Sequence, residues 1–243
     1  MAGASRRFTE AGYGAPKYEL PLAGRSVFEH AVASFSAYFE SHPFLFVVGP
    51  HEGAAGFVGE TCLRLRLADA QVVTLSGPTT GQAETVELGL AELGVDARTP
   101  VTIFNIDTFR PGFTFPGPGW LADSDGWLEV FRGEGANWSY VRPAPGPDPV
   151  ALETAEKRPI SDLYCTGLYH FARAEDFHFA LARERAAPSM NELYVAPLYN
   201  HLIAEGRRIG YRLIERDEVV FCGTPEEYQA LGGVKPPAQP PQP

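Results

Sequence analysis

Short apolar runs that alternate with helix-patterned segments place the strongest constraint on the fold of this chain. FLFVV (44–48) is a continuous apolar run, and QVVTL (71–75) and VTIFN (101–105) are two further predicted strands. Continuous apolar runs of this length are typical of strands that are buried on both faces. Helix-patterned segments occupy 26–40, 54–67 and 83–93. The alternation predicts an α/β fold with a mixed, mostly parallel sheet that is flanked by helices.

Two helices are predicted to begin at a capping box. Ser26 and Glu29 have the S-x-x-E spacing in which side chain and backbone cap each other reciprocally. Thr79 and Gln82 have the equivalent T-x-x-Q spacing before the segment 83–93.

The second half of the chain carries more strand than helix patterning. WLEVFR (127–132) and NWSYVR (137–142) are predicted to form a hairpin across GEGA. The further elements predicted are strands at 165–171, 208–214 and 218–222 and helices at 174–185, 192–204 and 225–231. We expect a single domain over residues 1–231 and a disordered, Pro-rich tail over 232–243.

Composition restricts the classes of partner. The formal net charge of −10 argues against DNA or RNA as a partner, although a small nucleotide needs only a few local cations. Cys62, Cys165 and Cys222 show no metal-ligand spacing, so we expect reduced thiols in a cytoplasmic protein. The sequence has no apolar run long enough to span a bilayer, so we expect no membrane partner. An oligomer is left open.

Candidate phosphate-binding and metal-binding residues lie in the first half of the chain. The opening stretch MAGASRRFTEAGYGAPK combines small residues with the cations Arg7 and Lys17. Backbone N–H groups in a loop without bulky side chains can approach a phosphate closely, and nearby cations balance its charge. Asp107 follows a predicted buried strand, where an acidic side chain has little structural reason to lie. It is a candidate Mg²⁺ ligand, and the alternative is an Asx-type turn.

Seven stretches in order resemble the sugar-1-phosphate nucleotidyltransferases of the nucleotide-diphospho-sugar transferase superfamily, most closely the small bacterial capsule and lipopolysaccharide members. The stretches are MAGASRRF with Pro16-Lys17, GPTTGQAETV, FNIDTF, ETAEKRPISD, CTGLYHF, NELYVAPLYN and FCGTPEEY. The resemblance implies a GT-A-like (Rossmann-like) fold. It also implies an Mg²⁺-dependent reaction in which a sugar 1-phosphate, or a similar small phosphate, and an NTP give an NDP-sugar and pyrophosphate.

The resemblance implies roles for the residues that match the family motifs around the nucleotide. Gly3 would face the nucleotide through its backbone, and Arg7 and Lys17 would contact the triphosphate and the leaving pyrophosphate. Gly81 and Gln82 match the base-recognition turn. The alternative for Gln82 is the capping role, and both can hold. Asp107 matches the metal-binding aspartate.

On the acceptor side, Glu156 would bind sugar hydroxyls and Lys157 the phosphate of the sugar. The alternative for this dipeptide is a solvated surface pair. Gly167 resembles a glycine near the sugar, although strand packing explains it equally well. All these residues are expected to line one cleft.

The chain departs from the family pattern in two places. Phe221 stands where the family has a second metal-binding aspartate, and the apolar strand that precedes the signature loop is apparently missing. We therefore expect the natural start to lie upstream of Met1. Two alternatives remain open: a non-catalytic nucleotide- or sugar-phosphate-binding relative, and an NDP-sugar-dependent glycosyltransferase. The latter usually shows Asp-x-Asp, and Asp123-Ser124-Asp125 has that pattern but lies in a predicted loop.

Overall fold

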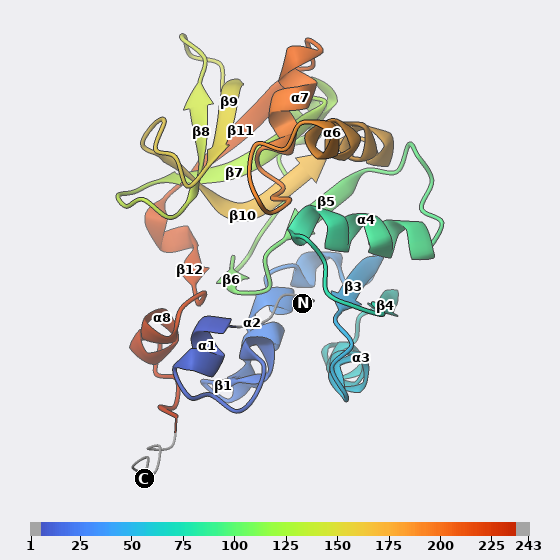
Figure 1. Cartoon of the computed structure of the whole chain (residues 1–243), viewed down its shortest axis with the longest axis vertical. Coiled ribbons are helices and arrows are strands. Elements are labelled where there is room, and N and C mark those ends of the chain that lie inside the picture. Colours follow the sequence, from blue (N-terminus) through green and yellow to red (C-terminus); the bar gives the residue numbers. More distant parts are fainter. Residues whose placement is uncertain (1–5, 237–243) are drawn as a thin grey trace. The chain divides into compact units, whose positions relative to one another are not determined.

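The computed structural model describes residues 6–236 and divides the chain into two compact units (Figure 1). The described part of the first unit comprises 6–78, 105–114 and 219–236, and the second comprises 79–104 and 115–218. The single domain expected over 1–231 stays a prediction. Residues 237–243 of the expected tail lie outside the described residues.

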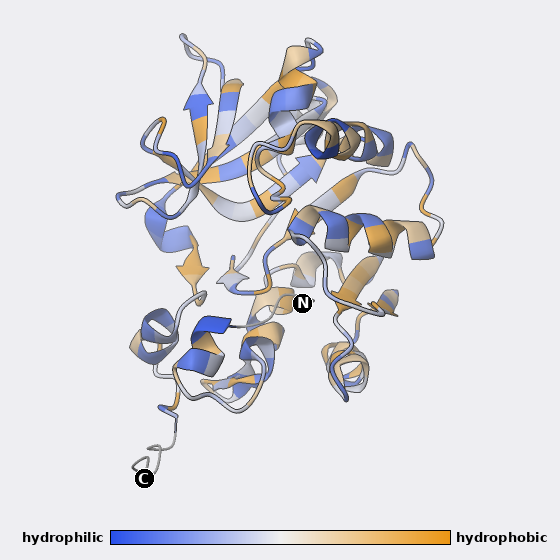
Figure 2. Cartoon of the chain, in the orientation of Figure 1, coloured by the Kyte–Doolittle hydropathy of each residue, from blue (hydrophilic) through white to orange (hydrophobic). Residues whose placement is uncertain are grey.

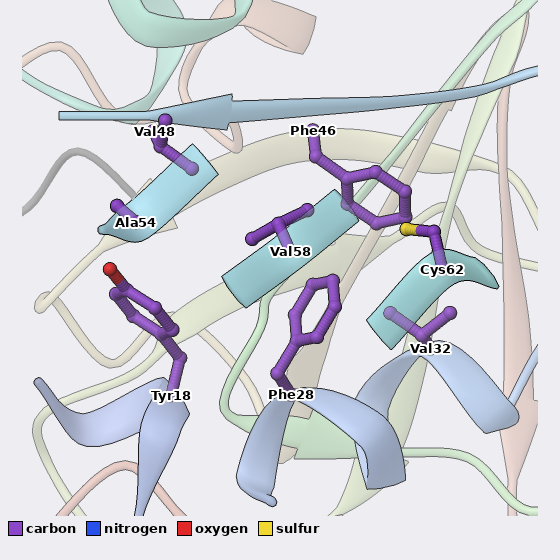
Figure 3. Close-up of a cluster of buried hydrophobic side chains, with 8 residues drawn as sticks. All are labelled: Tyr18, Phe28, Val32, Phe46, Val48, Ala54, Val58 and Cys62. Atoms are coloured by element: carbon purple, nitrogen blue, oxygen red, sulfur yellow. The ribbon is translucent and has the colours of Figure 1, made fainter. Parts of the chain in front are cut away.

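A short parallel sheet and two helices enclose the core of the first unit. Strand β3 (Phe44–Val48) pairs in parallel with β4 (Ala70–Thr74), and α2 (Val27–Ala33) and α3 (Ala54–Leu65) supply the helical side chains. Figure 3 shows how these side chains pack: Phe46 and Val48 from β3 lie against residues of α3, and Phe28 and Val32 come from α2. The predicted capping box of Ser26 and Glu29 is present at the start of α2.

Short elements complete the first unit. They are α1 (Arg6–Glu10), η1 (Lys17–Glu19), β1 (Pro21–Leu22), β2 (Arg25–Ser26), η2 (Ser36–Tyr38), β6 (Thr108–Phe109), β12 (Val220–Phe221) and α8 (Pro225–Ala230). Strands β6 and β12 pair antiparallel. Figure 2 shows β12 as hydrophobic and most of α8 as hydrophilic. A capping box between Thr224 and Glu227 begins α8.

The sequence predicted a loop at the start of the chain, but residues 6–10 form the helix α1. The reason is Phe8, which is buried and packs against the rings of Tyr13 and Tyr228, at centroid distances of 5.4 and 6.1 Å. The packing of this one aromatic side chain against two other rings stabilises the short helix.

A six-stranded mixed sheet forms the centre of the second unit. Its strands are β5 (Val101–Phe104), β7 (Gly126–Arg132), β8 (Ser139–Pro143), β9 (Ala151–Glu156), β10 (Leu163–Phe171) and β11 (Ile209–Ile214). The order is β11-β7-β10-β8-β9, and β5 also pairs with β10. The helices of this unit are α4 (Gln82–Glu92), α5 (Pro118–Ala122), α6 (Ala174–Ala186) and α7 (Leu198–Ala204), with the single turn η3 (Arg216–Glu218).

The mixed α/β, Rossmann-like fold is confirmed. Strands β7 and β11 are parallel, as β3 and β4 are, whereas β10 runs antiparallel to β5, β7 and β8. In the described part of this sheet, antiparallel strand pairs therefore outnumber parallel ones, although the sequence predicted a mostly parallel sheet. Strands β7 to β10 follow one another without an intervening helix, and a crossover helix is what usually makes neighbours parallel.

The predicted hairpin between 127–132 and 137–142 is wrong. Strands β7 and β8 lie on opposite edges of β10, which pairs Cys165 with Val130 and Tyr164 with Tyr140. The physical reason is the nine-residue β10, of which all but His170 are buried. A strand this apolar stabilises the fold most from the centre of the sheet, so it separates its two neighbours.

Two helix starts also differ from the sequence-based expectation. Helix α7 begins at Leu198 rather than at Glu192, because Pro197 restricts the residue before it and suits a helix start. At α4 the N-cap is Gly81 rather than the predicted Thr79. The Thr79 hydroxyl instead bonds that of Thr85 at 2.7 Å. Among residues 6–236, no helix is long and apolar enough to cross a membrane.

Candidate functional site

In the first unit, Lys17 and Asp107 form an ion pair across 90 residues of sequence. Nζ of Lys17 lies 2.5 Å from Oδ2 of Asp107, and the two side chains are 16% and 26% exposed. Lys17 is the first residue of η1, and its neighbour Tyr18 is buried in the core cluster, which anchors this turn (Figure 3). Asp107 lies in the turn between β5 and β6, where the N–H of Thr108 bonds the carbonyl of Asn105 at 3.3 Å.

A second carboxylate lies beside this pair. Oε2 of Glu227 accepts hydrogen bonds from the backbone N–H groups of Gly223, at 2.7 Å, and Thr224, at 3.0 Å. A Cβ placed on Gly223 would lie 3.2 Å from Oδ2 of Asp107 and 3.5 Å from Oε2 of Glu227. The missing side chain of Gly223 therefore leaves a small space between the two carboxylates.

Cys222 forms the buried floor of this site. Its N–H donates to the carbonyl of Asp107 at 2.8 Å, and its side chain is fully buried. Burial raises the pKa of the Cys222 thiol to about 12, with the charge of Lys17 acting in the opposite direction. The thiol is therefore neutral at physiological pH, and the charges of the site belong to Lys17 and the carboxylates.

Two other predicted or discussed residues of this region, Arg7 and Phe221, have different surroundings. Arg7 is exposed on α1, and Gly3 lies outside the described residues. Phe221 is half-buried in β12 and pairs with Thr108, the residue after Asp107. An apolar ring therefore stands on the strand next to the predicted metal-binding aspartate.

In the second unit, Gly81 and Gln82 begin α4. The backbone of Leu193 closes over Gly81: the N–H of Leu193 donates to the carbonyl of Thr80 at 3.0 Å, and the N–H of Ala83 donates to the carbonyl of Leu193 at 2.9 Å. A Cβ on Gly81 would lie 2.5 Å from both the N and the O of Leu193. Gly81 is therefore required by close backbone approach, and it places Gln82 at the helix start.

Glu156 and Lys157 lie at the end of β9. The hydroxyl of Ser139 donates to Oε2 of Glu156, and the hydroxyl of Tyr169 lies 3.4 Å from that of Ser139. Burial raises the pKa of Glu156, while Ser139 and the charge of Lys157 act in the opposite direction.

Lys157 has a left-handed backbone conformation, with φ of 53°. This region is uncommon for a residue other than glycine and costs on the order of 1–3 kcal/mol. The N–H of Lys157 donates to the carbonyl of Trp138 at 2.8 Å, which holds the backbone in this conformation. The solvated surface pair considered for Glu156-Lys157 therefore does not describe Glu156, which is half-buried and hydrogen-bonded, whereas Lys157 is exposed.

Gly167 lies at an irregularity in β10. Its φ is 94°, and the pairing of β10 with β7 shifts between Cys165 and Tyr169. A side chain is strained at this φ, so strand geometry explains this glycine. Gly167 lies two residues before Tyr169, whose hydroxyl is within 3.4 Å of that of Ser139.

Solved structures provide the comparison that decides the family. The chain is 50% identical to a nucleoside-diphosphate-sugar pyrophosphorylase from Vibrio cholerae RC9, with a TM-score of 0.90 and coverage of 95% of this chain and 97% of that one. The chain belongs to the nucleoside-diphosphate-sugar pyrophosphorylases, a family of sugar-phosphate nucleotidyltransferases. The resemblance inferred from the seven sequence stretches is thereby confirmed for the family.

More distant structures share the fold of this pyrophosphorylase family member. The inositol-1-phosphate CTP transferase from T. maritima is 14% identical, with a TM-score of 0.70 and coverage of 95% of this chain and 91% of that one. A UTP-bound UGPase from Acinetobacter baumannii is 15% identical, with a TM-score of 0.65 and coverage of 94% and 88%. No protein-family model matches the chain, and the comparison with curated proteins gives no match.

Sequence reasoning missed two residues that act on the predicted acceptor site. Nζ of Lys157 donates to the hydroxyl of Tyr194 at 2.6 Å and lies 4.7 Å from the centre of its ring. Burial raises the pKa of the Tyr194 hydroxyl, and the charge of Glu192 raises it further. Both residues belong to NELYVAPLYN, a stretch that resembles the family, but the predicted helix over 192–204 hid their position in a loop.

The donor set of the first unit fits a hard divalent cation. Mg²⁺ is usually bound by one or two carboxylates together with substrate phosphates. Asp107 is partly exposed, and only its Oδ2 takes part in the ion pair with Lys17. The space beside Gly223 borders the same carboxylate. Among residues 6–236, no group of three or more His, Cys, Asp or Glu side chains could hold a metal, so a bound cation would need further ligands such as substrate phosphates or water.

Proposed function

We propose that this protein transfers a nucleotidyl group from an NTP to a sugar 1-phosphate, or to a similar small phosphate, and releases pyrophosphate. The observation that carries the proposal is the 50% identity over 95% of the chain to a protein described as a nucleoside-diphosphate-sugar pyrophosphorylase. The Lys17–Asp107 pair in one unit and the Glu156-Lys157 pair in the other supply the polar groups that such substrates need.

The proposed reaction is an in-line displacement at phosphorus. A phosphate oxygen of the sugar phosphate attacks the α-phosphorus of the NTP and forms a new P–O bond. The bond between the α-phosphorus and the bridging oxygen of the β-phosphate breaks, and its electron pair leaves with pyrophosphate. The attacking phosphate is already largely ionised at neutral pH, so positioning and charge neutralisation matter more than a general base.

The proposed roles follow from charge and position. Lys17 and the exposed Arg7 bind the triphosphate and stabilise the charge that develops on the leaving pyrophosphate. Gln82, at the start of α4, contacts the base. Glu156 binds sugar hydroxyls, and Lys157 binds the phosphate of the acceptor. That all these side chains line one cleft stays a prediction.

We further propose that Mg²⁺ is the cofactor and that Asp107 is its protein ligand. When bound, the cation would neutralise charge on the phosphates of the NTP. Asp107 holds Lys17 in place through the other carboxylate oxygen, so one side chain can orient two positive charges.

The proposed physiological role is the supply of activated sugars. The seven sequence stretches resemble nucleotidyltransferases of bacterial capsule and lipopolysaccharide synthesis, so we propose a role in making activated sugars for surface polysaccharides. The substrates are phosphorylated metabolites, and the three cysteines are buried free thiols. Both are consistent with work in the cytoplasm.

The test is pyrophosphate release from four NTPs crossed with a panel of sugar 1-phosphates, with and without Mg²⁺. We expect release with at least one pair, and only when Mg²⁺ is present. Nucleotide binding without release from any pair would instead favour the non-catalytic relative. Phe221 favours this second candidate. It pairs with Thr108, the residue after Asp107, and stands where the family has a second metal-binding aspartate.

A further inference from the structure

The side chain of Tyr194 contacts the ammonium group of Lys157 in two ways. Lys157 donates from Nζ to the hydroxyl of Tyr194 at 2.6 Å, and the charge of Glu192 acts on Tyr194. The aromatic ring of Tyr194 also lies 4.7 Å from the same ammonium group, which adds a cation–π contact. An exposed lysine has rotational freedom along four bonds, so two contacts to one rigid ring restrict it strongly.

Tyr194 is itself held in place. It directly follows Leu193, whose N–H and carbonyl are both bonded to the turn around Gly81, at 3.0 and 2.9 Å. Leu193 is also buried. The main chain next to Tyr194 therefore cannot move without breaking these two backbone hydrogen bonds.

We propose that Tyr194 is a positioning residue for the acceptor phosphate: it holds the ammonium group of Lys157 ready to bind the phosphate of the sugar. The proposal rests on the proposed function and names a residue to which no role had been assigned. Binding groups that are already in position lose less conformational entropy when the ligand arrives. The left-handed backbone of Lys157, with φ of 53°, is a second sign that its direction is fixed.

The ionisation of Lys157 agrees with this arrangement. The hydrogen bond to Tyr194 is the largest cause that raises the pKa of Lys157, and the charges of Glu156 and Glu192 add to it. Burial acts in the opposite direction. Lys157 is therefore positively charged before an anionic ligand binds.

The test compares Tyr194→Phe with Tyr211→Phe. Phenylalanine at 194 keeps the ring and removes the hydroxyl. We expect the KM for the sugar 1-phosphate to rise about tenfold, because a hydrogen bond to a charged group is lost. The KM for the NTP should stay within about twofold of the wild type. Tyr211, in β11 of the same unit, loses the same hydroxyl and should leave both constants unchanged.

A second measurement needs no turnover. The chain has three lysines, Lys17, Lys157 and Lys235, so selective ¹³C labelling of lysine gives three side-chain signals. Lys157→Arg assigns the signal of interest. In Tyr194→Phe we expect this signal to titrate at lower pH and to report weaker binding of the sugar 1-phosphate.

The outcomes separate the inference from the proposed function. If the wild type turns over no substrate pair, the proposed function fails, and the NMR titration alone decides the role of Tyr194. If Tyr194→Phe leaves the Lys157 signal and the sugar-phosphate affinity unchanged, or tightens binding, the inference is overturned. The same holds if no sugar 1-phosphate shifts the Lys157 signal in the wild type.

Discussion

Lys17 is an unusual lysine because its charge is fixed rather than solvated. Its ammonium group lies 2.5 Å from Asp107 and 5.8 Å from the ring centre of Phe8, and the side chain is only 16% exposed. A surface ion pair contributes little to stability, but a fixed and partly desolvated charge stabilises a transition state effectively. This arrangement suits charge that develops on a leaving pyrophosphate.

We therefore predict that Lys17→Met lowers kcat by about 100-fold or more while the fold persists. Methionine keeps the length of the side chain and its contact with Phe8, and removes only the charge. Asp107→Asn should lower kcat similarly and raise the Mg²⁺ concentration needed for half-maximal activity. Steady-state kinetics with an Mg²⁺ titration, together with circular dichroism, measures both effects.

The third lysine supplies the matched control. Lys235 is exposed near the end of the described chain, and Lys235→Met removes the same charge. Its activity should equal that of the wild type. Wild-type rates in Lys17→Met, or a loss of activity that merely tracks loss of helical signal, would contradict the assignment of this pair.

Single residues differ in how far the sequence could predict their surroundings. Asp107 was a good candidate because an acidic residue at the end of an apolar strand stands out locally. Tyr194 was not, since its contact with Lys157 joins residues 37 positions apart in sequence. An aromatic residue within an apolar stretch carries no local mark that distinguishes a core position from a hydrogen-bonding one.

The start of α4 depends on the contact between Gly81 and Leu193. A Cβ at position 81 would lie 2.5 Å from two backbone atoms of Leu193, and neither can rotate away as a side chain would. The two backbone hydrogen bonds of Leu193 would have to lengthen instead. Because Tyr194 follows Leu193, such a shift also displaces the partner of Lys157.

We predict that Gly81→Ala destabilises the protein by about 1–3 kcal/mol, as overpacking against a well-packed neighbour generally does. Gly77→Ala is the matched control, because a Cβ there meets no atom within 4 Å. It should change stability by less than about 0.5 kcal/mol. Urea unfolding measures both variants, and equal midpoints for the two would show that the close approach to Leu193 is absent in solution.

The sequence predicted individual helices and strands well, but it did not predict which strands pair with each other. FLFVV was predicted as a strand with the bounds Phe44–Val48 that β3 has, because an apolar run between a proline and a glycine is a local signal. The strand that pairs with β7 could not be predicted from neighbouring residues. A hairpin was the obvious interpretation of two neighbouring strands, yet β10 contributes a longer apolar surface and lies between β7 and β8.

Across the whole molecule, the three thiols are a source of pH dependence. Cys62, Cys165 and Cys222 are buried free cysteines, with exposed fractions of 4%, 4% and 0%. Burial raises the pKa of Cys62 to about 11 and that of Cys222 to about 12, and it also raises the pKa of Cys165. Each thiol therefore stays protonated in the folded protein at pH values where it ionises in the unfolded chain.

The sign of the effect follows from proton linkage. Above pH 9, the ordinary pKa of the thiol here, the unfolded chain binds fewer protons than the folded protein, so raising the pH favours unfolding. The contribution of each thiol is fully present below pH 9 and is lost as the pH rises toward the folded pKa values of about 11 and 12. Each thiol contributes at most about 1.4 kcal/mol per unit of pH in this window.

We therefore predict that the urea midpoint is nearly constant from about pH 7.5 to 9, as far as the thiols determine it, and falls steeply between about pH 9 and 10.5 under reducing conditions. Cys62→Ala should show a shallower fall, because one of the three ionising thiols is removed from the unfolded chain. Its midpoint at pH 7.5 gives the cost of the lost packing separately. A wild-type midpoint that stays level to pH 10.5, or an identical slope in Cys62→Ala, would mean that these thiols are accessible to solvent in the folded protein.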